Sequence, residues 1–333
     1  MPTNSFQKKN LMYEGSVKRI FATEQASHLV FEFTDDYSVF DWGKMPDTIP
    51  QKGEGLAKLM AVLFERLEER GVKTHFRGFD GGRNVLVEKI GVYRPERITE
   101  GGRNFYTYPK TMQRPYLIPL EVVFRFEVCA GSSFIKRHPE KNYQVGQRFE
   151  KPYIEMFTKL EDKDRPLSNE EALKISGLTP AQFEEVTMKT SEVALILKKW
   201  FAEKGIRLMD GKLEWGLSAG GEIILVDAIG PDEMRLEKQN IQLSKEVLRE
   251  FYRQTQWYQD LENAKEEGET KGYADWKALV KNPPPPLPAR LKELVSGMYL
   301  ALVNDIANEK IFKSASLDEV VKEMSSYLEG GPR

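Results

Sequence analysis

The sequence is poor in cysteine and histidine, and it has no long apolar run. A single cysteine, Cys129, among 333 residues excludes an intrachain disulfide and suits a reducing compartment. The three histidines, His28, His75 and His138, lack ligand spacing, which argues against a structural zinc site. No apolar stretch reaches about 18 residues, and the N-terminal segment lacks the apolar run of a signal peptide. We therefore expect a cytoplasmic protein with no membrane association.

An excess of charge of one sign is also missing. The 49 Lys and Arg residues nearly balance the 51 Asp and Glu residues, leaving a formal net charge of −2. No overall basic field would recruit nucleic acid, so nucleic acid is not an expected partner, although a local basic patch stays open. The composition, with 40% hydrophobic and 30% charged residues, is typical of a globular protein. The length suits one large domain or two closely packed lobes.

The first part of the chain is rich in strand-forming residues. Strands are predicted in three segments, 11–40 (a hairpin turning at Gly15, then a third strand), 84–95 and 118–128. Residues 54–70 place apolar side chains at i, i+3 and i+4 before Gly71, which predicts an amphipathic helix. Residues 94–116 lack periodicity and indicate an inserted loop or an extra hairpin.

Helical signals begin near residue 168. Ser168 with Glu171, and Thr179 with Gln182, have the spacing of capping boxes. A helix is predicted from Pro180 to Lys204, since proline is favoured at the first helical position.

The remaining elements set the fold class. A glycine-turned hairpin at 209–235 is followed by a helical tail at 243–265, the run PPPPLP at 283–288 and a last helix with its apolar stripe at 291–302. The proline run is expected to be a stiff spacer, with a partner's docking site as the alternative. This order is not a regular βαβ alternation. It predicts an α+β protein with two antiparallel-sheet lobes and a cleft between them.

The 209–235 hairpin carries unexpected charges. Asp210, Lys212 and Glu214 alternate along one strand and so share a face, and Asp227 interrupts an apolar partner strand. Buried charges require pairing, a metal or phosphate, and carboxylates with phosphate oxygens suit Mg²⁺. A regular hairpin would set Glu214 opposite Ile223, with Asp227 about 13 Å from Glu214 at roughly 3.3 Å per residue. One ion would then require bent strands, whereas two ions or a polyphosphate would not. We favour a metal–nucleotide site over a solvated edge.

Two segments suggest anion binding less strongly. The Gly15 turn could present backbone N–H groups to phosphates beside Lys18, although an ordinary hairpin is the favoured interpretation. The polar loop at 35–55 holds Ser38, Asp41 and Lys52 and enters a helix N-terminus, which suits an anion. A plain connection fits this loop equally well.

The segment 121–137 places a cation in a strand. Arg125 stands in the middle of a strand of buried type, and Ser132 lies in the small-residue turn that follows. An arginine there suits bidentate recognition of a carboxylate or phosphate. A salt bridge to a core carboxylate is an equally good explanation.

Five ordered motifs resemble those of the SAICAR synthetase (phosphoribosylaminoimidazole-succinocarboxamide synthase) family over about residues 11–260. They read MYEGSVKR, YSVFDWGKMPDTIPQKG, LEVVFRFEVCAGSSFIKR, MDGKLEWG and VDAIGPDEMR. The resemblance implies a two-lobed, ATP-grasp-like fold with ATP between the lobes. We expect a β-rich, ATP-covering lobe at 1–120 and an α+β lobe at 121–333, which holds the 207–235 hairpin and a helical tail.

The family resemblance also implies a reaction and its cofactors. Mg²⁺ and ATP would phosphorylate the carboxylate of the aminoimidazole ribotide CAIR, and the amine of L-aspartate would displace phosphate to give SAICAR. The resemblance implies that the catalytic residues are Lys212 and Asp210, and that magnesium is bound by Glu214 and Asp227. The residues implied to bind ATP are Gly15, Ser16, Lys18 and Glu121. Those implied to bind the substrates are Ser38, Asp41, Lys52, Arg125, Ser132 and Arg235.

Three departures keep alternatives open. In the family's GKxK turn, Ser16 stands in place of a lysine. In its DFK motif, Gly211 stands in place of phenylalanine, and in its DEISPD motif Ala228 stands in place of an acid. Three alternative functions therefore stay open. They are a paralogous ligase using another amine or heterocyclic carboxylate, a small-molecule kinase, and a nucleotide-binding regulatory domain without turnover. The oligomeric state, including a homo-oligomer, stays open.

Overall fold

The first of two antiparallel sheets is built by the N-terminal part of the chain. The computed structural model describes residues 6–100, 103–271 and 275–330. Five strands pair in the order β1–β2–β3–β5–β4. They are β1 (Leu11–Glu14), β2 (Lys18–Ala22), β3 (His28–Phe33), β5 (Asn84–Glu88) and β4 (Phe76–Phe79). The hairpin that turns at Gly15 and the third strand after it are therefore confirmed.

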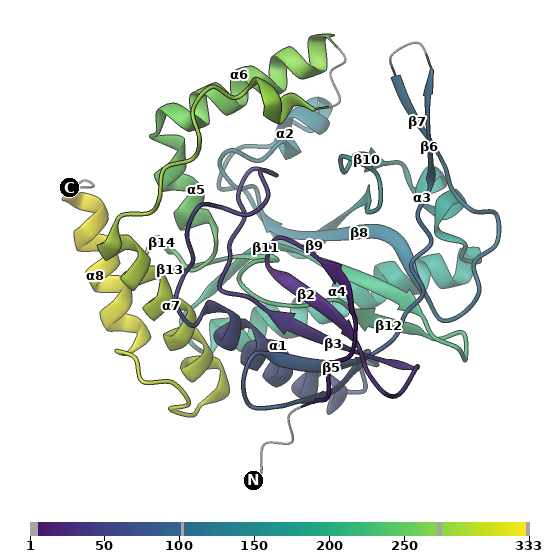
Figure 1. Cartoon of the computed structure of the whole chain (residues 1–333), viewed down its shortest axis with the longest axis horizontal. Helices are drawn as coiled ribbons and strands as arrows, with labels where there is room; N and C mark the ends of the chain where they lie inside the picture. The colour runs from purple at the N-terminus through teal and green to yellow at the C-terminus, as the bar shows by residue number, and fades with distance from the viewer. Residues whose placement is uncertain (1–5, 101–102, 272–274, 331–333) are drawn as a thin grey trace.

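The second sheet is larger and follows in the chain (Figure 1). Its strands pair in the order β10–β9–β8–β11–β13–β14, and β12 pairs with β11. They are β8 (Tyr116–Glu127), β9 (Arg148–Thr158), β10 (Pro166–Leu167), β11 (Arg207–Leu217), β12 (Ile223–Val226), β13 (Met234–Lys238) and β14 (Ile241–Gln242). The change from one sheet to the other thus falls just before the expected lobe boundary at 120.

The two sheets are joined by backbone hydrogen bonds. The N–H of Leu225 donates to the carbonyl of Lys73 at 2.8 Å, and the N–H of His75 donates to Leu225 at 3.0 Å. Lys73 and His75 lead into β4, whereas Leu225 lies in β12. The end of the 209–235 hairpin is therefore held against the N-terminal sheet, which fixes where the two sheets meet.

The long helices begin and end close to where the sequence predicts. Helix α1 (Lys52–Glu68) is followed by Gly71, whose φ of +84° favours glycine. Capping boxes open both α3 (Asn169–Ser176) and α4 (Pro180–Ala202), as expected from Ser168 and Thr179. Helix α4 packs against β11 and β9, so it covers one face of the second sheet. Two short turns, α2 (Phe134–Arg137) and η1 (Pro139–Lys141), lie between β8 and β9.

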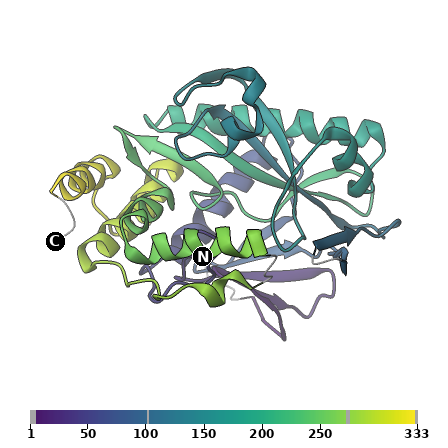
Figure 2. The ribbon, with the colours of Figure 1, turned by 90° about the horizontal axis from the view of Figure 1, so that it is seen from above.

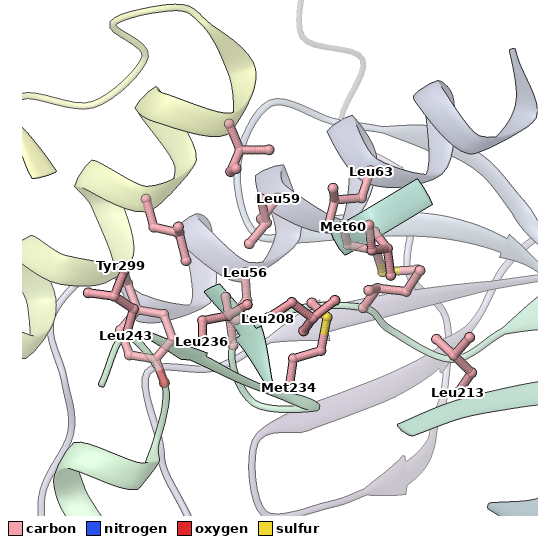
Figure 3. Close-up of a cluster of buried hydrophobic side chains, with 14 of the residues drawn as sticks. Leu56, Leu59, Met60, Leu63, Leu208, Leu213, Met234, Leu236, Leu243 and Tyr299 are labelled. Atoms are coloured by element: carbon pink, nitrogen blue, oxygen red, sulfur yellow. The ribbon is translucent and has the colours of Figure 1, made fainter. Parts of the chain in front are cut away.

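Helix α1 is packed in the middle of the molecule. Figure 3 shows its apolar side chains facing the second sheet and the C-terminal helices. The side chains in this contact are Leu56, Leu59, Met60 and Leu63 from α1, Leu208 from β11, Met234 and Leu236 from β13, and Tyr299 from α7. All of them are buried. Because each buried large apolar side chain contributes about 1.5–3 kcal/mol, this contact fixes α1 relative to the second sheet.

The C-terminal part is helical (Figure 2). Its elements are α5 (Glu246–Arg253), α6 (Gln256–Lys271), η2 (Trp276–Leu279), α7 (Ala289–Ala307) and α8 (Leu317–Glu329). The predicted tail is therefore two helices, and α8 was not predicted. The proline run packs on its own chain, since Pro285 accepts a hydrogen bond from the Tyr252 hydroxyl at 2.9 Å. Within the described residues, no helix is long and apolar enough to cross a bilayer.

The segment 94–116 contains the extra hairpin that the sequence left as one of two choices. Strands β6 (Glu96–Glu100) and β7 (Arg103–Thr107) form a two-stranded arm that stands out beside β10 (Figure 1).

Candidate active site

The pairing of the 209–235 hairpin differs from the prediction. Glu214 lies opposite Val226 rather than Ile223, because a five-residue turn at 218–222 sets Leu217 opposite Ile223. Asp227 therefore follows directly after the residue that faces Glu214. Its φ of 61° also turns the chain out of the strand. The separation of about 13 Å expected for a regular hairpin was wrong, since it assumed a shorter turn.

The charged residues of β11 share a face, as predicted. In the pairing with β8, Asp210 lies opposite Arg125 and Glu214 lies opposite Glu121. Lys212 lies between them and donates to Glu121, with Nζ and Oε1 separated by 2.6 Å. Both Glu121 and Glu214 are buried. The strand pair therefore presents alternating charges to the space between the sheets.

Two lysines from outside β11 complete this network. Lys18 of β2 forms an ion pair with Asp227, which links the two sheets through side chains. Lys159 directly follows β9, forms an ion pair with Glu214, and lies 3.4 Å from Glu121. Lys159 was not among the predicted site residues. Three ammonium groups, those of Lys18, Lys159 and Lys212, thus converge on three carboxylates.

Burial and charge separate the carboxylates into two types. Burial raises the pKa of Glu214 to about 7, and the nearby Asp227 charge adds to this rise. Burial also acts on Asp227, but Lys18 and Lys159 outweigh it and hold its pKa well below the usual range. Burial lowers the pKa of Lys212, yet the Glu121 carboxylate outweighs burial and raises it. The Glu214 and Asp227 charges likewise outweigh burial and raise the pKa of Lys159. Lys159 and Lys212 therefore stay charged, whereas Glu214 can gain or lose a proton near neutral pH.

A small cavity adjoins Lys18. Its volume is about 20 Å³, enough for one water molecule, and Ala228, Asp232 and Glu233 contribute to its lining. Burial raises the pKa of Glu233 to about 8, and the charge of Asp232 adds to the shift. Sequence analysis did not single out Glu233.

Arg125 and Arg235 converge on one carboxylate. Arg125 Nη1 lies 2.5 Å from Asp210 Oδ2, and Arg235 Nη1 lies 2.8 Å from the same oxygen. Arg125 is only 4% exposed and also faces Glu155 at 3.5 Å. The salt bridge to a core carboxylate, one of the two explanations for Arg125, is therefore present. Ser132 lies in the following turn, where its hydroxyl accepts from Phe134 N at 3.2 Å.

The 35–55 loop disperses its three predicted site residues. Ser38 is half-buried, whereas the side chain of Asp41 is 93% exposed. Lys52 is fully buried as the first residue of α1, and its Nζ lies 2.7 Å from Asp232 Oδ2. The hydroxyl of Tyr299 donates to the other oxygen of Asp232 at 2.6 Å. In this structure Lys52 is thus held in an internal ion pair with Asp232, and its contact with a substrate stays a prediction.

Ser16 and Gly211, two of the residues that differ from the family motifs, lie in different local surroundings. Gly15 and Ser16 form the turn before β2, where Gly15 N donates to Lys18 O at 2.8 Å. Gly211 faces away from Asp210 and Lys212, toward the core. A Cβ there would lie 2.6 Å from Phe124 Cζ, so the Phe124 ring already fills the space. The Gly211 departure therefore belongs to core packing.

Two neighbouring carboxylates could hold a metal together with a ligand. Among residues 6–100, 103–271 and 275–330, no cluster of three or more His, Cys, Asp or Glu side chains could hold a metal ion. Glu214 and Asp227 form a pair. Mg²⁺ commonly binds through one or two carboxylates together with phosphate oxygens and water, so this donor set fits it.

Comparisons with known proteins agree in naming one family. A family model described as SAICAR synthetase matches residues 11–265. A protein of Archaeoglobus fulgidus, provisionally assigned as phosphoribosylaminoimidazole-succinocarboxamide synthase, is 35% identical over 337 residues, which cover 95% of this chain and 100% of that protein. The phosphoribosylaminoimidazole-succinocarboxamide synthase of Thermoplasma acidophilum is 30% identical over 318 residues, covering 90% of this chain and 99% of that protein.

Solved structures of the same name have a similar fold. A type-2 SAICAR synthetase in complex with ADP matches with a TM-score of 0.58 and 28% identity, over 83% of this chain and 99% of that one. The SAICAR synthase of Saccharomyces cerevisiae, complexed with SAICAR, matches with a TM-score of 0.64 over 92% of this chain and 99% of that one. At 21% identity, the yeast likeness shows the fold alone.

Proposed function

This chain belongs to the SAICAR synthetase family, and from that premise we propose that it is the ATP-dependent ligase that joins CAIR to L-aspartate. The products are SAICAR, ADP and phosphate. One observation carries the assignment: Lys18 of the first sheet meets Asp227 of the second, beside Glu214, Lys159 and Lys212. Such a junction of cations and paired carboxylates suits a polyphosphate with a divalent metal.

The three ammonium groups are proposed to bind the ATP phosphates. Lys18, Lys159 and Lys212 each pair with a carboxylate, so phosphate would replace one ionic partner by another. The Gly15–Ser16 turn precedes Lys18 and would lay its backbone over the same phosphates. Because these ammonium groups are half-buried, they act in a lower dielectric than bulk water and stabilise phosphoryl charge more strongly than fully solvated ones.

Mg²⁺ would be held by Glu214 and Asp227. When bound, it would neutralise charge on the transferred phosphoryl group. Glu214 must lose its proton to act as a metal ligand. Because its pKa is about 7, this deprotonation costs little free energy near neutral pH.

The chain's other residues would bind and orient the two acceptors. The CAIR carboxylate attacks the γ-phosphorus to form an acyl phosphate, and the aspartate amine then displaces phosphate. Lys212 would neutralise the reacting carboxylate. Arg235, whose side chain is 23% exposed, is better placed than buried Arg125 to reach the ribotide phosphate together with Ser132. Asp210 would hold both guanidinium groups in register.

The loop residues have different proposed tasks. Ser38 and Asp41 remain candidates for contact with aspartate, because they lie in the segment that precedes α1. Lys52 instead fixes Asp232, and through it the chain that follows Asp227.

The proposal is tested by incubating purified protein with CAIR, ATP, Mg²⁺ and a panel of amino acids. We expect ADP and SAICAR to form only with L-aspartate. Glu214→Gln and Asp227→Asn should abolish turnover, whereas Glu222→Gln on the exposed turn of the same hairpin should not. ADP release with another amine would favour the paralogous ligase. ADP release without any amine, giving a stable phosphorylated product, would favour the kinase. Nucleotide binding without turnover would favour the regulatory domain.

A further inference from the structure

The β6–β7 arm is fastened at its base to the loop 159–165, which connects β9 and β10. Arg97 Nη1 lies 2.8 Å from Asp162 Oδ2, and the Tyr106 hydroxyl accepts from Asp162 N at 3.1 Å. Tyr108, which directly follows β7, donates its hydroxyl to Glu161 Oε1 at 2.9 Å. Three side chains of the arm segment therefore contact two consecutive residues of the loop.

The same loop carries Lys159 into the charged network. Lys159 is its first residue and pairs with Glu214 and Glu121. At the other end of the loop, Arg165 Nε lies 3.1 Å from Glu161 Oε2. Glu161 thus receives one bond from the arm and another from within the loop. The arm is therefore linked to Lys159 through the backbone of residues 159–162.

In the part of the chain that the structure describes, the two strands of the arm pair only with each other. Ile98 and Phe105 lie opposite each other in the arm, and their exposed fractions are 46% and 51%. A two-stranded hairpin alone is at best marginally stable in water. The contacts with Asp162 and Glu161 therefore order the arm and the loop together, and each restricts the other.

We propose that the β6–β7 arm is a positioning element that holds Lys159 over the nucleotide phosphates by fixing the loop 159–165. This inference rests on the proposed function, since it assigns Lys159 to the nucleotide. Without the arm contacts, the loop must be ordered during binding, and that entropy cost lowers affinity for the nucleotide. Arg97, Tyr106 and Tyr108 act through Lys159 and touch no substrate.

The test removes two hydroxyl groups without changing ring packing, in Tyr106→Phe/Tyr108→Phe. Thr99→Val is the matched control, because it removes a hydroxyl whose hydrogen bond, to Asn104 at 2.9 Å, lies within the arm. We expect hydrogen exchange in residues 159–165 to accelerate in the double variant. We also expect Kd for Mg-ADP to rise about threefold to tenfold, as the loss of one exposed and one partly buried hydrogen bond implies. Thr99→Val should leave both measurements unchanged.

A double-mutant cycle with Lys159→Met distinguishes positioning from general stability. If the arm acts through Lys159, the arm variant should weaken Mg-ADP binding far less in the Lys159→Met background. If the losses in Mg-ADP affinity are additive, or if hydrogen exchange in residues 159–165 of the arm variant equals that of the wild-type protein, the inference is overturned while the proposed function stands. Absence of Mg-ADP binding in the wild-type protein would overturn the proposed function and this inference with it.

Discussion

Replacing Lys52 by methionine gives the most direct test of how the site is built. Lys52 is fully buried, its Nζ lies 2.7 Å from Asp232 Oδ2, and it stands 5.5 Å from the centre of the Tyr299 ring. The Lys52→Met variant keeps the aliphatic stem but leaves the Asp232 carboxylate buried, with Tyr299 as its hydrogen-bond donor. Breaking one partner of a buried ion pair costs about 3–5 kcal/mol.

The loss should depend on pH in a defined direction. In the wild-type protein, burial raises the pKa of Asp232, but Lys52 and Lys245 together outweigh it and hold the pKa below the usual 3.8. The contribution of the pair is therefore present above that value and disappears as the pH falls through the folded-state pKa. In Lys52→Met, Lys245 and the Tyr299 hydroxyl still oppose burial but Lys52 does not, so the Asp232 pKa lies higher than in the wild-type protein and the variant gains less stability than the wild type as the pH rises. The deficit should be largest near neutral pH and smallest in acid.

Urea unfolding measures the effect, with Lys58→Met as control. Lys58 lies on the same helix with a half-buried side chain over the Phe79 ring, and its replacement should change stability by no more than about 0.5 kcal/mol. An unchanged unfolding midpoint in Lys52→Met, together with a raised KM for CAIR or aspartate, would refute the reasoning. It would restore the direct substrate contact predicted from the sequence.

Three further outcomes are expected. Lys18→Met should raise Kd for Mg-ATP about 10- to 100-fold by calorimetry, because it removes a charge-assisted contact to phosphate; an unchanged Kd would contradict that role. Because folding raises the pKa of Glu214 from 4.5 to about 7, it opposes stability increasingly as the pH rises between those values. Glu214→Gln should flatten that decline in urea unfolding at about pH 5 and about pH 7.5, and an equal decline in both proteins would contradict the assignment. Gly211→Ala should cost about 1–3 kcal/mol, since its Cβ would lie 2.6 Å from Phe124 Cζ, and Phe124→Leu should recover part of the loss in thermal unfolding.

Local signals predicted most of the elements. The capping boxes at Ser168 and Thr179 and the stop at Gly71 depend on neighbours within a few residues, so they can be recognised in sequence. Helix α8 was missed although Ser316 and Glu319 form the same capping box at its start. Its signal was available, and it was overlooked behind the proline run and the longer apolar stripe of α7.

Contacts that depend on register and long-range pairing were harder to predict. The distance from Glu214 to Asp227 was misjudged because it depends on the length of the hairpin turn, and one strand position moves a side chain by roughly 3.3 Å. Lys159 follows a strand with no motif of its own, and its ion pairs with Glu121 and Glu214 become evident only once β9 is placed beside β8. Lys52 was assigned to the polar loop that enters α1, and sequence alone cannot show that Asp232 is buried beside it.

The three departures from the family motifs spare the charged network for different reasons. Gly211 lies on the core face of β11, where Phe124 fills its space, so it removes no group from the side that holds Lys212. A lysine is missing at Ser16, yet Lys18, Lys159 and Lys212 still bring three ammonium groups to the junction. Ala228 lacks an acid, but Glu233 lines the same cavity. Phe124 thus fills the space at Gly211, three lysines supply the charge missing at Ser16, and Glu233 offers a carboxyl group near Ala228. The three differences therefore do not favour the rival functions over the CAIR–aspartate ligase.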